Sequence, residues 1–341
     1  MTHPVDSAVA QAHTDVMGLF RRHPAGLDEV CRAVRDRLTA MPVLDPHDPR
    51  TWNSYALITA DVQTLLGYLR EAGVASGESE HFRALLIRVL YYLYESEKAK
   101  TGVLLAELVH SDWQAQLGEV HADTLNATSR LAACLYAQGE PKRARPLFER
   151  VHQQQASQFG DDDPATLRAA CNLGACLTQL GEYGAAFLLN EDTVRRCEQQ
   201  LGEDHETTIL ATENLAGTLF GLERHRTALT LYQDIHQRRR RASGENSLLT
   251  LNAEASIAIT LHTLGDYETA RAVNAGLLPR FERVGGKDHS GTKHTHSRLV
   301  KNLRALGRYE EAEEVHGGRP KYGSSTPEGG HGALAPRHRG T

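Results

Sequence analysis

The amino-acid sequence predicts an all-α fold, a solenoid of stacked helix pairs. Three observations lead to this prediction: a glycine recurs every 42 residues, a threonine follows each of these glycines by six residues, and an alanine recurs in the same register. The glycines are Gly118, Gly160, Gly202, Gly244 and Gly286; the threonines are Thr124, Thr166, Thr208, Thr250 and Thr292; the alanines are Ala144, Ala186, Ala228, Ala270 and Ala312. A fixed period of about 20 to 50 residues is typical of a repeat protein.

Each unit of 42 residues is expected to form two helices. The first begins near the threonine, and its apolar residues follow helical spacing at Leu167, Leu173, Leu177 and Leu180. Asp163 is a suitable N-cap, and Pro164 suits the first helical position. Gly181 then ends the first helix, and the second helix is expected from about residue 183 to residue 200. The recurring alanine is expected where two helices cross closely.

The turn between the two helices has its own signature. A second glycine recurs at Gly139, Gly181, Gly265 and Gly307, and Glu223 replaces it once. One period before the first clear unit, helices are expected over residues 82–94 and 98–113. In this degenerate unit Gly102 replaces the crossing alanine and Glu97 replaces the turn glycine. Atypical terminal units are typical of solenoids, because an end repeat has a neighbour on one side only.

The spacing of small residue, leucine, glycine, tyrosine and alanine resembles the tetratricopeptide repeat, in its 42-residue kinesin-light-chain-like form. The segments that carry the likeness are NLGACLTQLGEYGAA (172–186), NLAGTLFGLERHRTA (214–228), IAITLHTLGDYETA (257–270) and LVKNLRALGRYEEA (299–312). The likeness covers about residues 79–316, so residues 76–316 are expected to hold about six units. It implies a right-handed solenoid whose first helices line a concave groove. HEAT-type repeats share the length but lack the glycine–tyrosine–alanine pattern.

Residues 1–75 do not follow the period and are expected to form an N-terminal helical cap or docking segment. Helices are expected over residues 8–22, 27–40 and 52–73. The DPHDPRTW junction (45–52) and the VLYYLYESE segment (89–97) resemble the region of actinobacterial NB-ARC and FxSxx-COOH-system tetratricopeptide proteins where the NTPase meets the repeats. The phosphate loop of such NTPases does not occur in this sequence. The resemblance therefore implies the repeat half without its NTPase, and no ATP or other cofactor is expected.

The tail at residues 317–341 is rich in glycine and proline and poor in apolar residues. Such a composition buries too little apolar surface to offset the entropy of ordering, so this segment is expected to be disordered.

Composition and charge exclude several classes of protein. With 38 Lys and Arg against 43 Asp and Glu, the net charge of −5 gives no global reason to bind nucleic acid. No apolar run approaches the roughly 20 residues that span a bilayer, and the N-terminus lacks the pattern of a signal peptide. Five cysteines suit a reducing compartment. We therefore expect a cytoplasmic protein without a membrane partner.

Candidate chemistry is sparse. His289, His294 and His296 lie close in sequence, but no cysteine pair or carboxylate accompanies them at the spacing of a metal site, so no metal is expected. Cys134 and Cys176 share one repeat position and are expected to fill space between helices. No nucleophile motif or HExxH motif occurs, so no catalytic residue is assigned and the chain is not expected to be an enzyme.

Four adjacent arginines, Arg238, Arg239, Arg240 and Arg241, end the second helix of one unit. Cations are favourable near a helix C-terminus, so a solvated helix end is the simpler interpretation. The alternative is a patch that grips phosphates or an acidic partner.

The concave groove is the main candidate binding site. One register position holds Arg130, Asn172, Asn214, Ser256 and Arg298, and positions nearby hold Arg168, Glu213, Asn252, Tyr136 and Phe220. The resemblance implies that asparagine at this position, here Asn172 and Asn214, hydrogen-bonds the backbone of a bound peptide. Arg130 and Arg168 are candidates to pair with a ligand carboxylate. The alternative is that these asparagines satisfy neighbouring helix ends or water.

The predicted function is a non-catalytic scaffold or regulatory adaptor that binds a peptide or helix of a partner protein in the groove, in bacterial signalling or regulation. Two alternatives stay open. The chain is a regulatory subunit that contacts nucleic acid through residues 238–241, or it is a structural protein that associates with itself.

Overall fold

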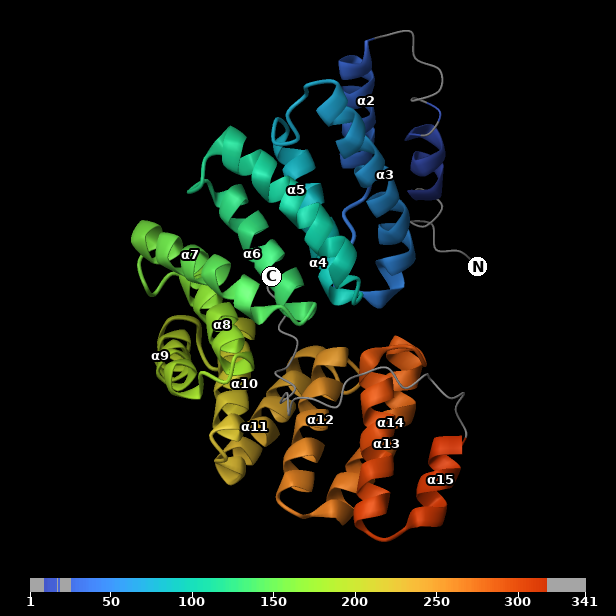
Figure 1. The fold of residues 1–341 in the computed structure, drawn as a ribbon, viewed down its shortest axis with the longest axis vertical. Helices are drawn as coiled ribbons and strands as arrows, with labels where there is room; N and C mark the ends of the chain where they lie inside the picture. The colour runs from blue at the N-terminus through green and yellow to red at the C-terminus, as the bar shows by residue number, and fades with distance from the viewer. Residues whose placement is uncertain (1–8, 17, 19–25, 318–341) are drawn as a thin grey trace. The chain divides into compact units, whose positions relative to one another are not determined.

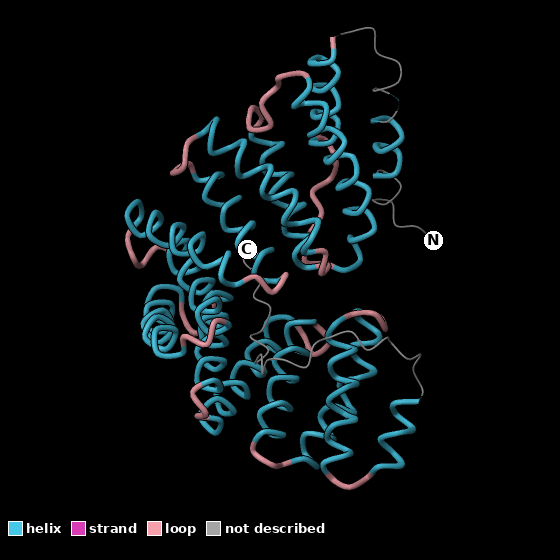
Figure 2. Tube along the Cα trace, viewed as in Figure 1, coloured by secondary structure: helices cyan, strands magenta, loops and turns pink. Residues whose placement is uncertain are grey.

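The computed structural model describes residues 9–16, 18 and 26–317, and in this part of the chain every regular element is a helix (Figures 1 and 2). The chain divides into two compact units, unit 1 at Met1–Gln154 and unit 2 at Gln155–Thr341. Consecutive helices pack against one another from α2 to α6 in unit 1 and from α8 to α15 in unit 2. The prediction of an all-α solenoid of helix pairs is confirmed.

Unit 1 begins with a helical segment at residues 9–16, inside the helix expected over residues 8–22, of which most of the remainder lies outside the described residues. Its further elements are α2 (Leu27–Thr39), η1 (Pro49–Thr51), α3 (Trp52–Glu71), α4 (Glu80–Glu95), α5 (Ala99–Leu117), α6 (Ala122–Ala137) and α7 (Pro141–Phe159), which continues past the unit boundary. The helices α2, α3, α4 and α5 lie where the sequence predicts them.

Unit 2 consists of four further helix pairs, the last of them short. Their helices are α8 (Pro164–Gln179), α9 (Tyr183–Leu201), α10 (Glu206–Gly221), α11 (His225–Ser243), α12 (Leu248–Thr263), α13 (Tyr267–Gly285), α14 (Ser290–Ala305) and α15 (Tyr309–Gly317). First helices also pack on first helices, α10 on α8 and α14 on α12. The predicted tail at 317–341 lies, from residue 318 on, outside the described residues.

The recurring glycines stand where the backbone must be left-handed. Gly202, Gly244 and Gly286 have φ angles of 87°, 81° and 83°. At the turn between α10 and α11, Glu223 keeps a φ of 62° although it has a side chain. Most residues with a Cβ avoid this conformation, because the Cβ comes too close to the following carbonyl oxygen. The recurring glycines therefore reflect a left-handed backbone conformation that each unit requires, and Glu223 keeps this conformation where it replaces glycine.

In three of the five clear units the recurring threonine donates a hydrogen bond to the glycine six residues before it. The hydroxyl of Thr208 donates to the carbonyl of Gly202 at 2.7 Å, Thr250 donates to Gly244 at 2.8 Å, and Thr292 donates to Gly286 at 2.7 Å. These three threonines are fully buried. Because a buried hydroxyl without a partner is costly, the glycine carbonyl satisfies the buried threonine in these three units.

The crossing position accepts small side chains only. The recurring alanines Ala144, Ala186, Ala228, Ala270 and Ala312 are all fully buried. In the degenerate unit, a Cβ built on Gly102 would lie 2.7 Å from the sulfur of Cys134. This close approach favours glycine over alanine at position 102. Cys134 is fully buried and fills space between helices, as predicted.

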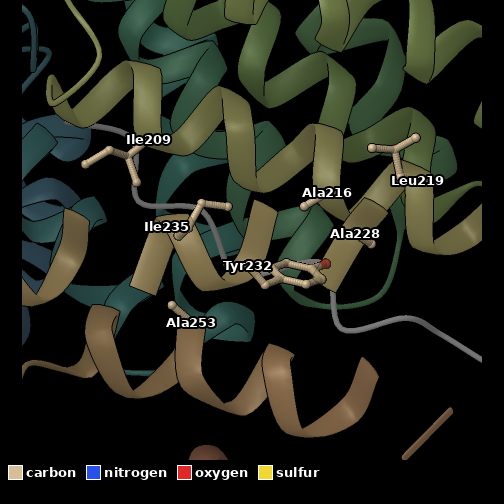
Figure 3. Close-up of a cluster of buried hydrophobic side chains, with 7 residues drawn as sticks. All are labelled: Ile209, Ala216, Leu219, Ala228, Tyr232, Ile235 and Ala253. Carbon is tan, nitrogen blue, oxygen red and sulfur yellow. The ribbon is translucent and has the colours of Figure 1, made fainter. Parts of the chain in front are cut away.

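Unit 2 holds a core between α10, α11 and α12 (Figure 3). Its buried residues are Ile209, Ala216, Leu219, Ala228, Tyr232, Ile235 and Ala253. Phe220, near the end of α10, packs on the edge of this cluster and is only partly buried. The core thus fixes the end of α10 and the start of α11, where the candidate site lies.

Candidate functional site

Unit 2 contains a pocket of about 760 Å³, which we call the unit-2 pocket. Two register positions of the repeat supply much of its wall. Tyr183, His225 and Tyr267 are the first residues of the second helices α9, α11 and α13. Phe220 and His262 occupy one position near the end of the first helices α10 and α12. Helix α14 closes the pocket with Arg298, Lys301 and Asn302. The stacking of similar units therefore places aromatic and cationic groups around one space.

The aromatic side chains of the pocket pack in pairs. The rings of Phe220 and His225 have centroids 4.8 Å apart at an angle of 58°, and those of His262 and Tyr267 have centroids 5.0 Å apart at 59°. Such tilted contacts are favourable and restrict the rotamers of both partners. The walls formed by α10–α11 and by α12–α13 are therefore largely prepared for an apolar ligand group.

Arg298 is the unusual charge of the pocket. It is only partly exposed, and no carboxylate among the described residues pairs with it. Burial alone lowers the pKa of Arg298 to about 10, against an ordinary value of 12.5. Two other partly buried arginines of unit 2 have partners: Arg280 lies 2.6 Å from Glu254, and Arg196 lies 2.7 Å from Asp162. Arg298 therefore presents an uncompensated positive charge to the pocket.

The two remaining charged residues of the lining, Lys301 and Glu223, carry opposite charges and are both exposed. Lys301, one turn after Arg298, is exposed and forms no ion pair with the described residues. Glu223 is the acidic residue of the lining, and its side chain is exposed at the turn after α10. An anionic group would replace the missing counter-charge of Arg298, and adjacent rings would cover an apolar group beside it.

A hydrogen bond joins two further residues of the lining. Nδ1 of His262 lies 2.5 Å from the side-chain oxygen of Asn302, which is 1 % exposed. Because an amide oxygen only accepts hydrogen bonds, His262 donates from Nδ1. Its other ring nitrogen, Nε2, takes no part in this hydrogen bond.

The predicted asparagines lie in the wall between first helices. Asn214 is 2 % exposed, and its amide nitrogen donates to the carbonyl of Cys171 on α8 at 2.7 Å. Asn172 is also buried, at 8 % exposed. Asn214 thus links two successive first helices through its donor. Peptide binding by Asn172 and Asn214 stays a prediction.

The other predicted groove residues are divided between the units. In unit 1, Tyr136 is buried and Arg130 stacks on the ring of Tyr91, 4.1 Å from its centroid. In unit 2, Arg168 and Asn252 are half-buried on α8 and α12. None of these four lines the unit-2 pocket. Their role in binding also stays a prediction.

The four adjacent arginines do not share one surface. Arg239 is 1 % exposed and pairs with Glu213 at 3.2 Å and with Glu206. Arg238 lies 2.7 Å from Asp234, and Arg241 lies 3.2 Å from Asp204. Only Arg240 of the run is exposed without an ion pair to a described residue. A sequence signal for the burial of Arg239 exists, since it follows Ala228, Tyr232 and Ile235 at helical spacing on the core face.

The histidine-rich stretch has structural contacts. His289 caps α14, since its Nδ1 accepts from the backbone of Gly291 at 3.1 Å, and His296 lies 2.8 Å from the carbonyl of Val315. His121 and His205 cap α6 and α10 in the same register. The described residues contain no group of three or more potential ligands placed to hold a metal. These histidine caps were not predicted from the sequence. The signal was available, because the three histidines occupy the repeat position of Asp163, which was predicted as an N-cap.

Sequence reasoning also missed most of the pocket. It placed Arg298 and Phe220 in or near the groove register but assigned no role to His225, His262 or Lys301. The available signal was the register itself, since His225 stands where Tyr183 and Tyr267 stand, and His262 stands where Phe220 stands. The isolation of Arg298 could not be found in this way, because it depends on which carboxylates reach it in space.

The comparisons with known proteins agree with this architecture. Residues 123–199 and 207–275 match the family model described as tetratricopeptide repeat. This part of the chain consists of tetratricopeptide repeats. The resemblance to that family is thereby confirmed. A comparison with curated protein sequences gives no significant match. None of the described helices combines the length and the apolar character that a membrane crossing requires.

Several solved structures are similar to this chain. A Rap protein complexed with Competence and Sporulation Factor is 11 % identical, with 91 % of this chain and 96 % of that chain covered and a TM-score of 0.53. The apo form of the quorum sensor NprR from B. thuringiensis is 14 % identical, with 92 % and 87 % covered and a TM-score of 0.52. A putative kinesin light chain from Podosopora anserina is 18 % identical, with 60 % and 98 % covered and a TM-score of 0.47. At these identities the first two likenesses support the fold alone.

Proposed function

We propose that the chain is a non-catalytic interaction scaffold or regulatory adaptor, and that the unit-2 pocket binds a partner segment carrying an acidic group beside an apolar one. The observation that supports this most is the uncompensated charge of Arg298 among the rings of Tyr183, Phe220 and Tyr267. The proposal places the protein in the cytoplasm of an actinobacterium, where it would serve bacterial signalling or regulation.

Arg298 has no ion-pair partner among the described residues. A partly buried cation without a partner loses hydration and gains no ion pair, which costs stability. A ligand carboxylate would restore the partner, and planar guanidinium groups bind carboxylates in a bidentate geometry. Lys301, one turn away, would add a second attractive charge at the exposed side. The same contacts would fix the position of the ligand along the pocket.

The solved structures are compatible with such a role. One protein of this fold is a Rap protein in complex with Competence and Sporulation Factor, and another is a quorum sensor. The resemblance of residues 45–97 to NB-ARC and FxSxx-COOH-system proteins adds a candidate setting, a regulatory module that acts with a separate NTPase. A partner protein from such a system is the natural source of the bound segment.

A random peptide library tests the proposal. Peptides are selected on the full chain and their affinities measured by fluorescence polarisation with wild type, Arg298→Met and Arg240→Met. Arg240 is the matched control, because it is an exposed arginine of unit 2 outside the pocket. We expect acidic peptides whose affinity falls at least about tenfold in Arg298→Met, equivalent to about 1.4 kcal/mol, and stays unchanged in Arg240→Met. Peptides that lose affinity only in Arg240→Met would refute the assignment of the pocket.

The asparagine prediction is tested beside it. Asn172→Ala leaves the known interhelical hydrogen bond of Asn214 intact, whereas Asn214→Ala removes the donor to Cys171 and is expected to destabilise unit 2. Asn172→Ala is therefore the informative variant. Weaker peptide capture by this variant, with unchanged helicity in circular dichroism, would extend the binding surface to α8.

A further inference from the structure

The histidines of the unit-2 pocket carry an inference that rests on the proposed function and concerns its regulation. His262 and His225 line the same space as Arg298 and Lys301. Histidine is the side chain whose charge ordinarily changes between pH 5 and pH 8. A proton gained in the pocket would therefore alter its attraction for an anionic group within the physiological range.

The two imidazole rings differ in their contacts. His262 donates from Nδ1 to Asn302 at 2.5 Å, so it can take a second proton at Nε2 without losing this bond. Nδ1 of His225 is buried without a hydrogen-bond partner among the described residues. A charged imidazole carries a proton on each of its two ring nitrogens. Charging His225 would therefore leave its Nδ1–H group buried without an acceptor. A second proton therefore costs His262 no hydrogen bond, whereas on His225 it would leave a buried N–H unpaired.

The charges around His262 come from each neighbouring element. Helix α14 contributes Arg298 and Lys301, the turn after α10 contributes Glu223, and α11 contributes His225. The first residues of α9 and α13 contribute the phenol rings of Tyr183 and Tyr267. A bound anion would attract an imidazolium at His262 as well as the guanidinium of Arg298.

We propose that the unit-2 pocket binds its anionic ligand together with a proton, which His262 takes up at Nε2. By linkage, proton uptake on binding means that the affinity rises as the pH falls through the range in which His262 titrates. The site would thus hold its partner more tightly in acidic than in alkaline conditions. His262 contacts the ligand group in this scheme, and Asn302 fixes the orientation of its ring.

Sodium sulfate is a suitable probe, because the charge of sulfate stays constant between pH 5.5 and pH 8. Binding to the full chain is followed by NMR shifts of pocket residues at constant ionic strength, set with sodium chloride. We expect about tenfold tighter binding at pH 5.5 than at pH 8.0 in the wild type. The His262 ring signal is expected to titrate at higher pH in sulfate than in chloride.

Matched variants come from the repeat register. His262→Gln keeps a donor for Asn302 but does not titrate, and His262→Phe introduces the residue that Phe220 places at the equivalent position. His225→Tyr introduces the residue of Tyr183 and Tyr267 at its position. Both His262 variants should bind sulfate with little pH dependence, and His225→Tyr should keep the tenfold change.

The outcomes separate the two proposals. Sulfate binding in the pocket with no pH dependence, or with the same dependence in His262→Gln, would overturn the proton coupling and leave the proposed anion site standing. Loss of the dependence in His225→Tyr would overturn the role of His262. No sulfate-induced shift in the pocket at either pH would overturn both the coupling and the anion site.

Discussion

Replacing Arg298 by methionine should stabilise the protein while it removes the proposed ligand contact. The pKa of Arg298 falls from 12.5 to about 10 because of burial alone. A difference of about 2.5 pH units corresponds to about 3 kcal/mol, at roughly 1.4 kcal/mol per unit. Because the guanidinium is still partly exposed to solvent, we take this value as an upper bound and expect a gain of about 1 to 2 kcal/mol. Methionine is unbranched and apolar, so it fills a similar volume.

The pH dependence of this gain has a definite sign. The folded-state pKa of Arg298 lies below its unfolded value, so the charged form is disfavoured in the folded state. This penalty is complete at every pH below about 10 and disappears as the pH rises from about 10 through 12.5. The advantage of Arg298→Met should therefore be constant across neutral pH.

Urea denaturation followed by circular dichroism provides the assay. Both tryptophans, Trp52 and Trp113, lie in unit 1, so their fluorescence would not report on the pocket. Hydrogen exchange of α14 localises the effect to unit 2. Arg280→Met is the matched control: Arg280 pairs with Glu254 at 2.6 Å, so its loss should destabilise by about 1 to 2 kcal/mol. A destabilisation of more than about 1 kcal/mol by Arg298→Met would refute the reasoning.

Three further predictions concern the repeat geometry and are measured by the same denaturation assay. Glu223→Gly should stabilise by about 1 kcal/mol, because the φ of 62° costs little for glycine. Thr250→Val should destabilise by about 1 to 2 kcal/mol, since it removes the donor to Gly244. Thr166→Val should be neutral or slightly stabilising, because the buried Thr166 hydroxyl has no hydrogen-bond partner among the described residues. Gly102→Ala should destabilise by about 1 to 3 kcal/mol through the contact with Cys134.

Each of these predictions has its own contrary result. A gain from Glu223→Ala equal to that from Glu223→Gly would show that the charge, and not the backbone angle, is responsible. Equal losses in Thr250→Val and Thr166→Val would remove the role of the threonine–glycine hydrogen bond. A neutral Gly102→Ala would show that the sulfur of Cys134 moves aside freely.

The repeat architecture could be predicted from the sequence because a few positions have strict backbone or packing requirements. A left-handed residue selects glycine, and a close helix crossing selects alanine. These constraints act within one unit, so a single sequence displays them once per period. The helices α8 to α14 accordingly lie where the glycines and threonines place them.

The contacts between units were harder to predict. Asn214 bonds to Cys171, a residue 43 positions earlier, and only the stacked structure shows that the amide is engaged within the protein. Arg239 and Arg240 are neighbours in sequence, yet one is buried in an ion-pair network and the other is exposed. The pocket around Arg298 likewise depends on residues from several helices and on the carboxylates that do not reach it.

The most direct test of the proposed site is the structure of the full chain bound to a selected acidic peptide. We predict that a peptide carboxylate lies about 2.8 Å from the guanidinium of Arg298, the distance of a charge-assisted hydrogen bond, with an apolar side chain against Phe220 or Tyr267. A peptide bound along Asn172 and Arg168 or at Arg240, with the unit-2 pocket empty, would contradict the account.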